Sequence, residues 1–405
     1  MKILITGAAG FVGKNLTAEL HSDQTRGEYA SDAAFVEHLY LYDLDTPEAE
    51  LWQACRDADF VFHLAGVNRA DNPEDFVRGN CDLTSRLLAM LEQCGNRCPV
   101  MFASSIQASL CGRYDTPYGR SKRECERLVF AYARRNHTQV YVYRFPNLFG
   151  KWCRPDYNSV TATFCHHIAN GLPITVDDPD TSLELLYIDD LVAAMTELLH
   201  GRVQRCDYRG TEALPCEDGT YGYVPTTHRV TLGEMVRLLE AFHRKAETPL
   251  IPSLPDGSFV KKLYATYISY LPPDRIVFPL QMHTDARGSF TELLRTSSNG
   301  QISVNIAKPG VVRGEHWHHS KWEVFVVVSG WGRIQQRKIG TDEILCFDVS
   351  GDRMEAVHLL PGYVHNIVNL SDTEDLVTLM WASACYDPAN PDTIFEEVKR
   401  SESES

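Results

Sequence analysis

The chain has 405 residues, which is too long for one ordinary domain and suits two or three. Its 44% apolar and 23% charged residues are ordinary values for a soluble globular protein. The formal net charge of −15 argues against a sequence-independent nucleic-acid binder and against a binder of anionic membranes, because neither would have a basic face to work with.

The 12 cysteines are scattered without a CxxC pair, so we expect reduced, buried thiols rather than disulfides. The chain enters a strand directly, without an apolar leader, and it has no run of about eighteen apolar residues. We therefore expect a cytoplasmic protein with no nucleic-acid or membrane partner.

The first predicted element is a strand over Lys2–Thr6, followed by a glycine-rich turn. Gly7 allows the tight turn, Gly10 lets the backbone approach a pyrophosphate, and Gly13 lets helix and strand pack closely. The phosphates are expected on the open N–H groups of the helix that begins near the end of this turn. The residues predicted to bind a nucleotide cofactor here are Gly7, Gly10, Phe11, Val12 and Gly13.

A second predicted strand, near Leu39–Tyr42, ends at Asp43. An acidic side chain at this place accepts hydrogen bonds from the adenosine ribose, which favours NAD over NADP. Asp45 and Asp32 are alternatives for the same role, and Asp43 could instead be a solvated loop carboxylate.

A third predicted strand follows Asp59 and runs into a turn of small residues. In a doubly wound sheet the cofactor passes the carboxyl ends of the strands, so this turn should contact it as well. The residues predicted to do so are Leu64, Ala65 and Gly66.

Polar residues with acid and base chemistry come next. A strand over Val100–Ala103 delivers Ser104 and Ser105 to the same edge of the sheet. Tyr118 and Lys122, four residues apart, lie on one face of a helix, and a nearby ammonium makes the phenol easier to ionise. The alternative interpretation is an exposed helix with a charged face.

Taken in this order, the motifs resemble those of the extended short-chain dehydrogenase/reductase family over about residues 1–245. The matching residues are Gly7/Gly10/Gly13, His63-Leu64-Ala65-Gly66, Ser104-Ser105, Tyr118 with Lys122, Arg144-Phe145-Pro146-Asn147-Leu148-Phe149-Gly150 and Tyr187-Ile188-Asp189-Asp190. The resemblance implies an α/β fold with a Rossmann-type doubly wound parallel sheet, NADPH or NADH as cofactor, and a nucleotide-activated sugar as substrate. It further implies that Tyr118 is the catalytic acid, that Lys122 orients it and binds the nicotinamide ribose, and that Ser105 polarises the carbonyl. The gap from Ser105 to Tyr118 is shorter than is common in the family, so Ser104 stays an alternative.

Residues 152–170 form a candidate substrate segment with Tyr157, Asn158 and a predicted helix over Thr161–Ala169. Val230–Phe242 has the spacing of an amphipathic helix and is predicted to serve packing.

Prolines between residues 249 and 279 then break the pattern, which indicates a domain boundary. We place it so that the domains are 1–272 and 273–405. The acidic and serine-rich end, 401–405, is expected to be a solvated tail.

From Met282 on, short β-type runs alternate with glycine turns, as in a small all-β jelly-roll barrel. The predicted strands are Ser303–Ile306, Glu323–Val328, Gly332–Gln336, Ile344–Val349, Met354–Leu359 and Leu376–Trp381.

A candidate metal site lies in this second domain. His316 and His318 point to the same face of a strand, Glu323 is expected on the next strand, and His365 on a strand that folds back beside them. Imidazole and carboxylate are ligands of zinc and similar divalent ions, so these four side chains are predicted to bind Zn²⁺ or a similar metal. The alternative is a barrel without metal, whose histidines line a polar pocket or act as a base. Either His316 or His318 could also face the substrate as the base.

These stretches resemble the two signature motifs of the cupin family, over about residues 281–385. The matching residues are Gly310-x5-His316-Trp317-His318-x4-Glu323-x6-Gly330 and Pro361-Gly362-x2-His365-x3-Asn369, and the segment Asp285-x-Arg287-Gly288-Ser289-Phe290-x-Glu292 is similar to the start of cupin-fold epimerases that act on keto-deoxysugar nucleotides. Such enzymes invert a carbon beside a ketone, which requires a base, an acid and a group that steadies the enolate oxygen. A metal can supply the last of these as a Lewis acid.

The combination resembles the bifunctional capsular-polysaccharide enzymes of the CapF type nearly end to end. Further matching segments are Phe149-Gly150-Lys151-Trp152-Cys153, Tyr267-Ile268-Ser269-Tyr270-Leu271-Pro272 and His316-Trp317-His318-His319. The resemblance implies a homodimer that acts on a UDP-2-acetamido-2,6-dideoxy-hexos-4-ulose, a UDP-activated 4-keto-deoxy amino sugar. The second domain would epimerise C3 and the first would reduce C4, giving UDP-N-acetyl-6-deoxy-talosamine, a precursor of UDP-N-acetyl-L-fucosamine. Two alternatives stay open: a plain reductase whose second domain is a structural dimerisation module, and a non-catalytic sugar-nucleotide sensor.

Overall fold

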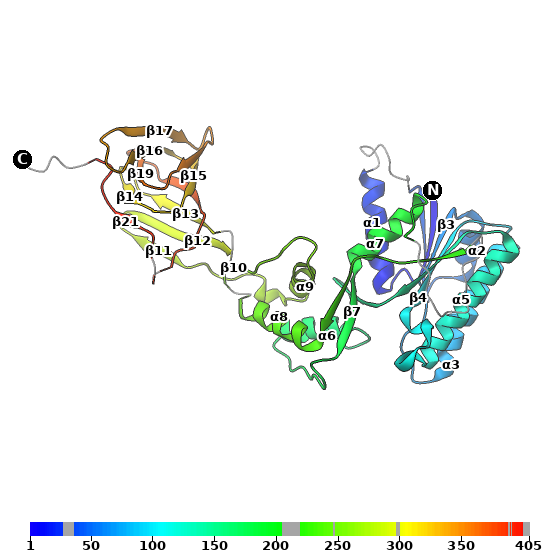
Figure 1. The fold of residues 1–405 in the computed structure, drawn as a ribbon. Helices are drawn as coiled ribbons and strands as arrows, with labels where there is room; N and C mark the ends of the chain where they lie inside the picture. Colours follow the sequence, from blue (N-terminus) through cyan, green and yellow to red (C-terminus); the bar gives the residue numbers. More distant parts are fainter. Residues whose placement is uncertain are drawn as a thin grey trace, which may run out of the picture. The chain divides into compact units, whose positions relative to one another are not determined.

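The computed structural model describes residues 1–26, 36–204, 219–245, 248–296, 300–387, 389 and 391–399 (Figure 1). The chain divides into two compact units, the first made of Met1–Glu240 with Gly257–Leu271 and the second of Ala241–Asp256 with Pro272–Ser405. The boundary at residues 272/273 stays a prediction. Asp32 and the segment 401–405, for which we made predictions, lie outside the described residues.

The first unit is built on a parallel sheet of six strands in the order β2-β1-β3-β4-β5-β8. The strands are β1 (Lys2–Thr6), β2 (His38–Tyr42), β3 (Phe60–His63), β4 (Val100–Ser105), β5 (Val140–Phe145) and β8 (Gly219–Gly222). From β1 the chain first forms β2 on one side of β1, and then crosses to form β3 and the later strands on the other side. The topological switch point therefore lies between β1 and β3, the place where such sheets bind ligands outside the carboxyl ends of their strands.

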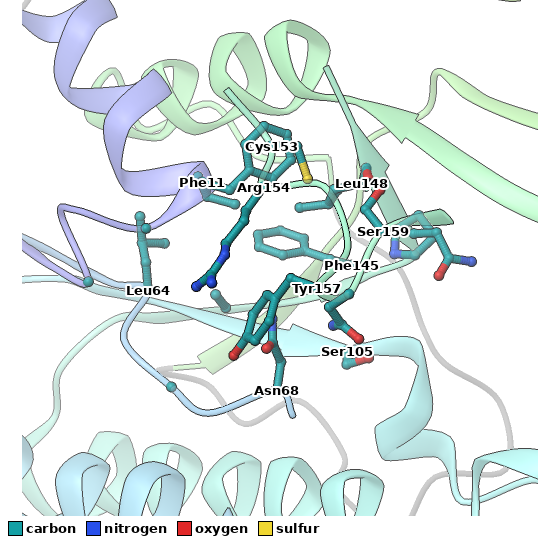
Figure 2. Close-up of a pocket in the computed structure, with 18 of the residues that line it drawn as sticks. Phe11, Leu64, Asn68, Ser105, Phe145, Leu148, Cys153, Arg154, Tyr157 and Ser159 are labelled. Carbon is teal, nitrogen blue, oxygen red and sulfur yellow. Dashed lines mark hydrogen bonds between the residues drawn. The ribbon is translucent and has the colours of Figure 1, made fainter. Parts of the chain in front are cut away.

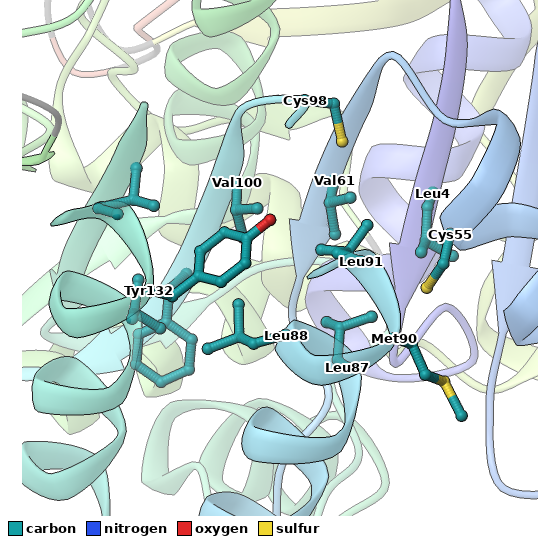
Figure 3. Packing of buried hydrophobic residues seen from close by; sticks show 14 of the residues in the cluster. Leu4, Cys55, Val61, Leu87, Leu88, Met90, Leu91, Cys98, Val100 and Tyr132 are labelled. Carbon is teal, nitrogen blue, oxygen red and sulfur yellow. The ribbon is translucent and has the colours of Figure 1, made fainter. Parts of the chain in front are cut away.

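Helices cover both faces of this sheet, and the residues of β1 alternate between them. Ile3 and Ile5 pack on the side of α1 (Phe11–Arg26) and α7 (Ile188–Leu199). Leu4 packs on the other side, in a core that Figure 3 shows in part and that draws residues from α2 (Glu48–Asp57), α4 (Leu83–Gln93) and α5 (Pro117–Asn136). The side chains of Ile3, Leu4 and Ile5 are fully buried, and each burial stabilises the folded state by about 1.5–3 kcal/mol. The predicted α/β class is confirmed.

Further helices and a small second sheet complete the first unit, whose boundary at Glu240 falls within α8. They are α3 (Pro73–Phe76), the π-helix η1 (Val77–Asp82), the 3-10 helices η2 (Ile106–Ser109) and η3 (Gly112–Tyr114), a sheet of β6 (Asn147–Phe149), β7 (Ser182–Tyr187) and β9 (Thr227–Thr231), and the helices α6 (Val160–Ala169), α8 (Leu232–Lys245) and α9 (Phe259–Ile268). The predicted helix over Val230–Phe242 is α8, but it begins at Leu232 because Val230 pairs with Leu183 in the small sheet. Helix α9 lies within the proline-rich stretch and was not predicted.

The second unit contains two β-sheets whose strands are almost all antiparallel (Figure 1, yellow to red). One has the order β10-β12-β13-β20-β15-β18 with β11 beside β12, and the other has the order β17-β16-β19-β14-β21. The strands are β10 (Leu250–Ile251), β11 (Met282–Asp285), β12 (Gly288–Thr296), β13 (Gln301–Ala307), β14 (Val312–Trp317), β15 (Glu323–Ser329), β16 (Trp331–Lys338), β17 (Ile344–Ser350), β18 (Ala356–Leu359), β19 (Tyr363–Asn369), β20 (Leu376–Ala382) and β21 (Ile394–Phe395). A β-rich second part of the chain is confirmed.

Two further findings concern the cysteine thiols and the helices. The prediction that the thiols are buried is wrong for Cys111 and Cys346, which are exposed. No helix in the described ranges is long and apolar enough to cross a membrane.

Candidate active site and candidate metal site

The glycine turn after β1 is held in close contact with the turn after β3. Gly7 has a φ of 73°, and a Cβ added to it would lie 2.7 Å from the backbone nitrogen of Ala65. A Cβ on Gly13 would lie 2.2 Å from the carbonyl oxygen of Gly7, so helix α1 can pack against the turn only through a glycine. Both glycines are therefore required by the backbone itself.

The backbone N–H groups of the turn divide into two sets. Gly7 and Ala8 donate to the carbonyl of Tyr42, and Ala9 donates to Oδ2 of Asp43 at 2.8 Å. The first N–H groups of α1, which begins at Phe11, have no acceptor within the helix and carry the positive end of its dipole. This second set is suited to bind a phosphate. Because the carboxylate of Asp43 already holds the turn, its contact with a ribose stays a prediction.

Tyr118 and Lys122 lie near the start of α5. The helix is capped by Thr116, whose hydroxyl accepts from the backbone N–H of Gly119 at 3.0 Å. The Nζ of Lys122 donates to the carbonyl of Ala103 at 2.9 Å, and the side chain is buried. The helix cap and this hydrogen bond fix both side chains against the end of β4.

The protonation of this pair differs from the sequence expectation. Burial raises the pKa of Tyr118 to about 12, and the hydroxyl of Ser105 opposes this rise. Burial also lowers the pKa of Lys122, against the opposing charges of Cys125 and Glu126. The sequence predicts that the ammonium eases ionisation of the phenol, whereas in the structure desolvation is the largest cause of the shift and Lys122 does not contribute to it. In this state Tyr118 is a proton donor.

The two serines of β4 have different partners. The hydroxyl of Ser104 donates to Oε1 of Glu126 at 2.6 Å in the buried core. The hydroxyl of Ser105 accepts the N–H of Gln107 at 3.2 Å and is also hydrogen-bonded to Tyr118, which places it beside the phenol. This difference favours Ser105 over Ser104 as the hydroxyl that faces a substrate.

These groups line one cavity of about 850 Å³ in the first unit (Figure 2). Of the predicted site residues, those that line it are Gly7, Gly10, Phe11, Val12, Gly13, Leu64, Gly66, Ser105, Tyr118 and Lys122, whereas Asp43 and Ala65 are not part of the lining. Figure 2 shows Leu64 and Ser159 on opposite sides, with Arg154 and Tyr157 between them. The cavity thus joins the glycine turn, the tyrosine and lysine, and the predicted substrate segment.

Three further side chains at the candidate active site were not predicted from the sequence. Lys14 and Arg154 line the cavity, and the Arg154 guanidinium lies 5.2 Å from the centre of the Tyr157 ring. Asn80, within η1, accepts the N–H of Val67 at 2.8 Å and donates to the hydroxyl of Ser121 at 2.9 Å. It therefore ties the turn after β3 to helix α5. A π-helix often marks a functional site, but the sequence does not show that residues Val77–Asp82 form a π-helix.

The predicted metal ligands of the second unit lie together. One ligand atom from each of His316, His318, Glu323 and His365 falls within 4.8 Å of the others. His316 is in β14 and His318 follows its end, Glu323 begins β15, and His365 is in β19. The two sheets of the unit therefore both contribute to the cluster.

The buried polar atoms of this cluster lack hydrogen-bond partners. Nε2 of His318, Oε2 of Glu323 and Nε2 of His365 are each buried without one. Oε2 of Glu323 lies 3.4 Å from Nε2 of His365 and 3.7 Å from Nε2 of His318, and its Oε1 lies 3.3 Å from Nζ of Lys321. Such atoms are costly to bury unpaired, so a cation between them would satisfy all three. The residues therefore fit a divalent metal.

The charge states agree with that fit. Burial lowers the pKa of His316 to about 4, so its imidazole is neutral near pH 7. Burial opposes ionisation of Glu323, but the neighbouring imidazoles and Lys321 outweigh it and hold the pKa of this carboxyl below its ordinary value. Neutral imidazoles and a carboxylate are the forms in which these groups bind zinc and similar ions.

Two family models match the chain. The model described as the NAD dependent epimerase/dehydratase family matches residues 3–205, and the one described as the polysaccharide biosynthesis C-terminal domain matches residues 283–394. The two matches fall in the two units that the structure separates.

Similar proteins extend along the whole chain. A UDP-2-acetamido-2,6-beta-L-arabino-hexul-4-ose reductase of Pseudomonas aeruginosa is 36% identical over 393 residues, which is 97% of this chain and 98% of that protein. The crystal structure of the capsular polysaccharide assembling protein CapF from Staphylococcus aureus is 44% identical with a TM-score of 0.83, covering 98% of this chain and 100% of that one. A UDP-glucuronic acid 4-epimerase from Bacillus cereus in complex with NAD is 18% identical with a TM-score of 0.50, over 67% of this chain and 98% of that one, and shows the fold alone. This chain therefore belongs to the NAD dependent epimerase/dehydratase family, as an extended short-chain dehydrogenase/reductase of the CapF type with a β-rich C-terminal domain.

Proposed function

We propose that this protein is a bifunctional nucleotide-sugar enzyme. Its first unit reduces the C4 ketone of a UDP-2-acetamido-2,6-dideoxy-hexos-4-ulose with NADPH or NADH, and its cupin-like second unit epimerises C3. The product is UDP-N-acetyl-6-deoxy-talosamine, a precursor of UDP-N-acetyl-L-fucosamine for a surface polysaccharide. The Pseudomonas relative, whose name gives a reductase of a UDP-hexul-4-ose, supports this substrate class.

The observation that carries the proposal is the charge of the cavity in the first unit. The charged residues that line it are Lys14, Lys122 and Arg154, all cationic, in a chain whose formal net charge is −15. A dinucleotide cofactor and a UDP-sugar each bring a diphosphate, and both need cations or open N–H groups. A volume of about 850 Å³ lies within the range of ligand-binding cavities.

The reduction follows from the residues beside the ketone. When bound, a reduced nicotinamide would supply the hydride for C4. Tyr118 donates its phenolic proton to O4, and Ser105 donates a hydrogen bond to the same oxygen, so that negative charge does not accumulate there. Lys122, held by the carbonyl of Ala103, places a positive charge beside the phenolate that remains and also binds the nicotinamide ribose.

The epimerisation requires loss and return of the C3 proton beside the same ketone. We propose that His318, Glu323 and His365 hold a zinc or similar divalent ion, with His316 as fourth ligand or as the base. A bound ion would supply a Lewis acid that stabilises the enolate oxygen. His316 is the better candidate for the base, because it is only partly buried whereas His318 is 2% exposed.

A plain reductase with a structural metal module is the second candidate, because buried orphaned ligand atoms fit a structural ion equally well. The experiment that decides is product analysis of the UDP-4-keto sugar incubated in heavy water, with and without reduced cofactor. We expect deuterium at C3 without the cofactor, and the reduced sugar with it. Reduction without any exchange at C3 would establish the second candidate, and absence of reduction would overturn the proposal for the first unit. A mass measurement in solution tests the proposed homodimer.

A further inference from the structure

The last described segment of the chain, Asp392–Val398, lies against the strand that carries His316. Its strand β21 pairs antiparallel with β14, so that Phe395 is opposite His316 and Ile394 is opposite Trp317. The backbone N–H of Glu396 donates to the carbonyl of Glu315 at 3.1 Å. The segment therefore forms the edge of the sheet at the candidate metal site.

Asp392 fastens the loop between His318 and Glu323. Its carboxylate accepts the backbone N–H groups of His319 at 2.8 Å and of Ser320 and Lys321 at 3.0 Å. It also accepts the hydroxyl of Ser320 at 3.1 Å. The carboxylate of Asp392 thus accepts hydrogen bonds from three backbone N–H groups of the loop that separates two of the candidate ligands.

The main-chain carbonyl of Asp392 also determines the tautomer of His318. It is hydrogen-bonded to Nδ1 of that ring. A carbonyl oxygen can only accept, so Nδ1 carries the proton, and in the neutral ring Nε2 then keeps its lone pair. Nε2 is the atom that faces Oε2 of Glu323 at 3.7 Å and has no hydrogen-bond partner. This contact orients the imidazole for binding a metal.

Glu315 connects the same segment to a second candidate ligand strand. It has a φ of 60°, in the left-handed region, at the register shift of β14 between Gly314 and His316. Its Oε2 accepts the N–H of Val398 at 2.6 Å, and its Oε1 accepts the amide of Asn366 at 2.8 Å. A residue in this strained conformation requires such support from its surroundings.

The end of the segment is anchored in the interior by Arg337, whose side chain is 1% exposed. It donates to the carbonyls of Val398 at 2.8 Å and Glu397 at 2.9 Å, and to Oε1 of Glu396 at 2.7 Å. Val398 is itself fully buried. These contacts hold the segment at both ends.

We propose that the segment Asp392–Val398 is the outer support of the metal site, in which Asp392 and Glu315 are positioning residues for His318 and His316. The proposal rests on the metal site of the proposed function. Outer partners of metal ligands typically change metal affinity by about 10- to 100-fold when they are removed. The carboxylate of Asp392 holds the loop that follows His318, and that of Glu315 holds the segment beside His316, so the loss of either should weaken zinc binding separately.

The test uses the full chain, with Zn²⁺ alone as the probe in competition with a chromophoric chelator. Asp392→Asn and Glu315→Gln are expected to raise the Kd for zinc, by up to the about 10- to 100-fold that is typical when a direct partner of a metal ligand is removed. Asp372→Asn, a change of an exposed carboxylate in the same unit, should leave the Kd unchanged. Thermal unfolding at saturating zinc should show the second unit folded in all three variants.

The outcomes separate this inference from the proposed function. If the unmodified chain binds no zinc, the proposed metal site is wrong. If it binds zinc and both variants bind it as tightly, Asp392 and Glu315 have no positioning role and the inference is overturned. It is likewise overturned if the second unit unfolds in these variants at saturating zinc, because the segment would then serve only the fold.

Discussion

Arg144 and Glu126 form an ion pair in the interior of the first unit, with side chains 1% and 0% exposed. Nε of Arg144 donates to Oε1 of Glu126 at 2.8 Å. The same carboxylate accepts the hydroxyls of Ser104 at 2.6 Å and Tyr221 at 3.0 Å. Glu126 lies one helical turn after Lys122 in α5, and Ser104 precedes Ser105 in β4. The ion pair therefore joins α5 to β5, and the hydrogen bond from Ser104 joins α5 to the strand that carries Ser105.

Glu126→Gln should lower the free energy of unfolding of the first unit by about 3–5 kcal/mol, because it removes one charge of a buried ion pair. Denaturant unfolding of the full chain measures this loss. Glu124→Gln, on the exposed side of the same helix, is the control and should change stability by less than about 1 kcal/mol. Equal stability of the two variants would show that the buried pair does not hold α5 against β5.

Tyr118→Phe should slow ketone reduction by about 10²-fold or more, because it removes the proton donor and leaves the ring. Cofactor binding and folding should be retained. Tyr114→Phe is the matched control, since it removes a hydroxyl from the lining of the same cavity. Single-turnover rates at saturating cofactor give the comparison, and near-normal reduction by Tyr118→Phe would contradict the assignment.

His63 makes the first unit sensitive to acid. Its ring nitrogens contact the hydroxyls of Thr6 at 2.7 Å and Thr84 at 2.9 Å, and burial lowers its pKa from 6.5 to about 3. The folded state binds the proton more weakly than the unfolded state, so the stability from the neutral ring is present above pH 6.5 and is lost as pH falls toward 3. Between pH 6.5 and pH 5 this loss should be about 2 kcal/mol. Denaturant unfolding at both pH values checks this, and His63→Gln should flatten the dependence, whatever its own stability.

Local patterns were sufficient to predict the first part of the candidate site. The strand β1, the glycine turn and the start of α1 are contiguous in the chain, and Gly7 and Gly13 are each required by a nearby backbone atom. Tyr118 and Lys122 are related by helical spacing alone. The same holds for the two histidines at the end of β14, whose alternation in a strand predicts a shared face.

Contacts between distant residues were not predictable. Asn80 acts through Ser121, 41 positions away, and Asp392 through Ser320, 72 positions away. A lone asparagine or aspartate carries no spacing that identifies such a partner. The histidines were expected on strands, but the bounds of β14 and β19 were not predicted, because candidate ligands and other polar residues interrupt the apolar pattern there. Helix α9 was not predicted because prolines flank it on both sides.

Asp43 should limit the use of NADPH. A carboxylate at the end of β2 repels the 2′-phosphate, so we expect NADH to be used at least as well as NADPH, while the resemblance to CapF-type enzymes favours NADPH. We therefore expect both cofactors to be oxidised. Asp43→Asn should raise the preference for NADPH over NADH by lowering KM for NADPH, and its amide oxygen can still accept the N–H of Ala9. Parallel assays of the oxidation of NADH and NADPH test this. If the enzyme strictly requires NADH and Asp43→Asn leaves that requirement unchanged, Asp43 is not the residue that limits the use of NADPH.

His365→Ala should release the metal from the second unit. His365 is 1% exposed, its Nδ1 faces the carbonyl of Tyr363 at 3.3 Å, and its Nε2 lies 3.4 Å from Oε2 of Glu323. Without this imidazole the carboxylate and His318 cannot enclose an ion, so elemental analysis should fall from about one zinc or similar ion per chain to near zero. C3 exchange should be lost with it, while reduction in the first unit persists. His358→Ala, an exposed histidine of the same unit, should keep the metal. Protein purified without chelator that holds no metal yet exchanges the C3 proton would rule the metal out.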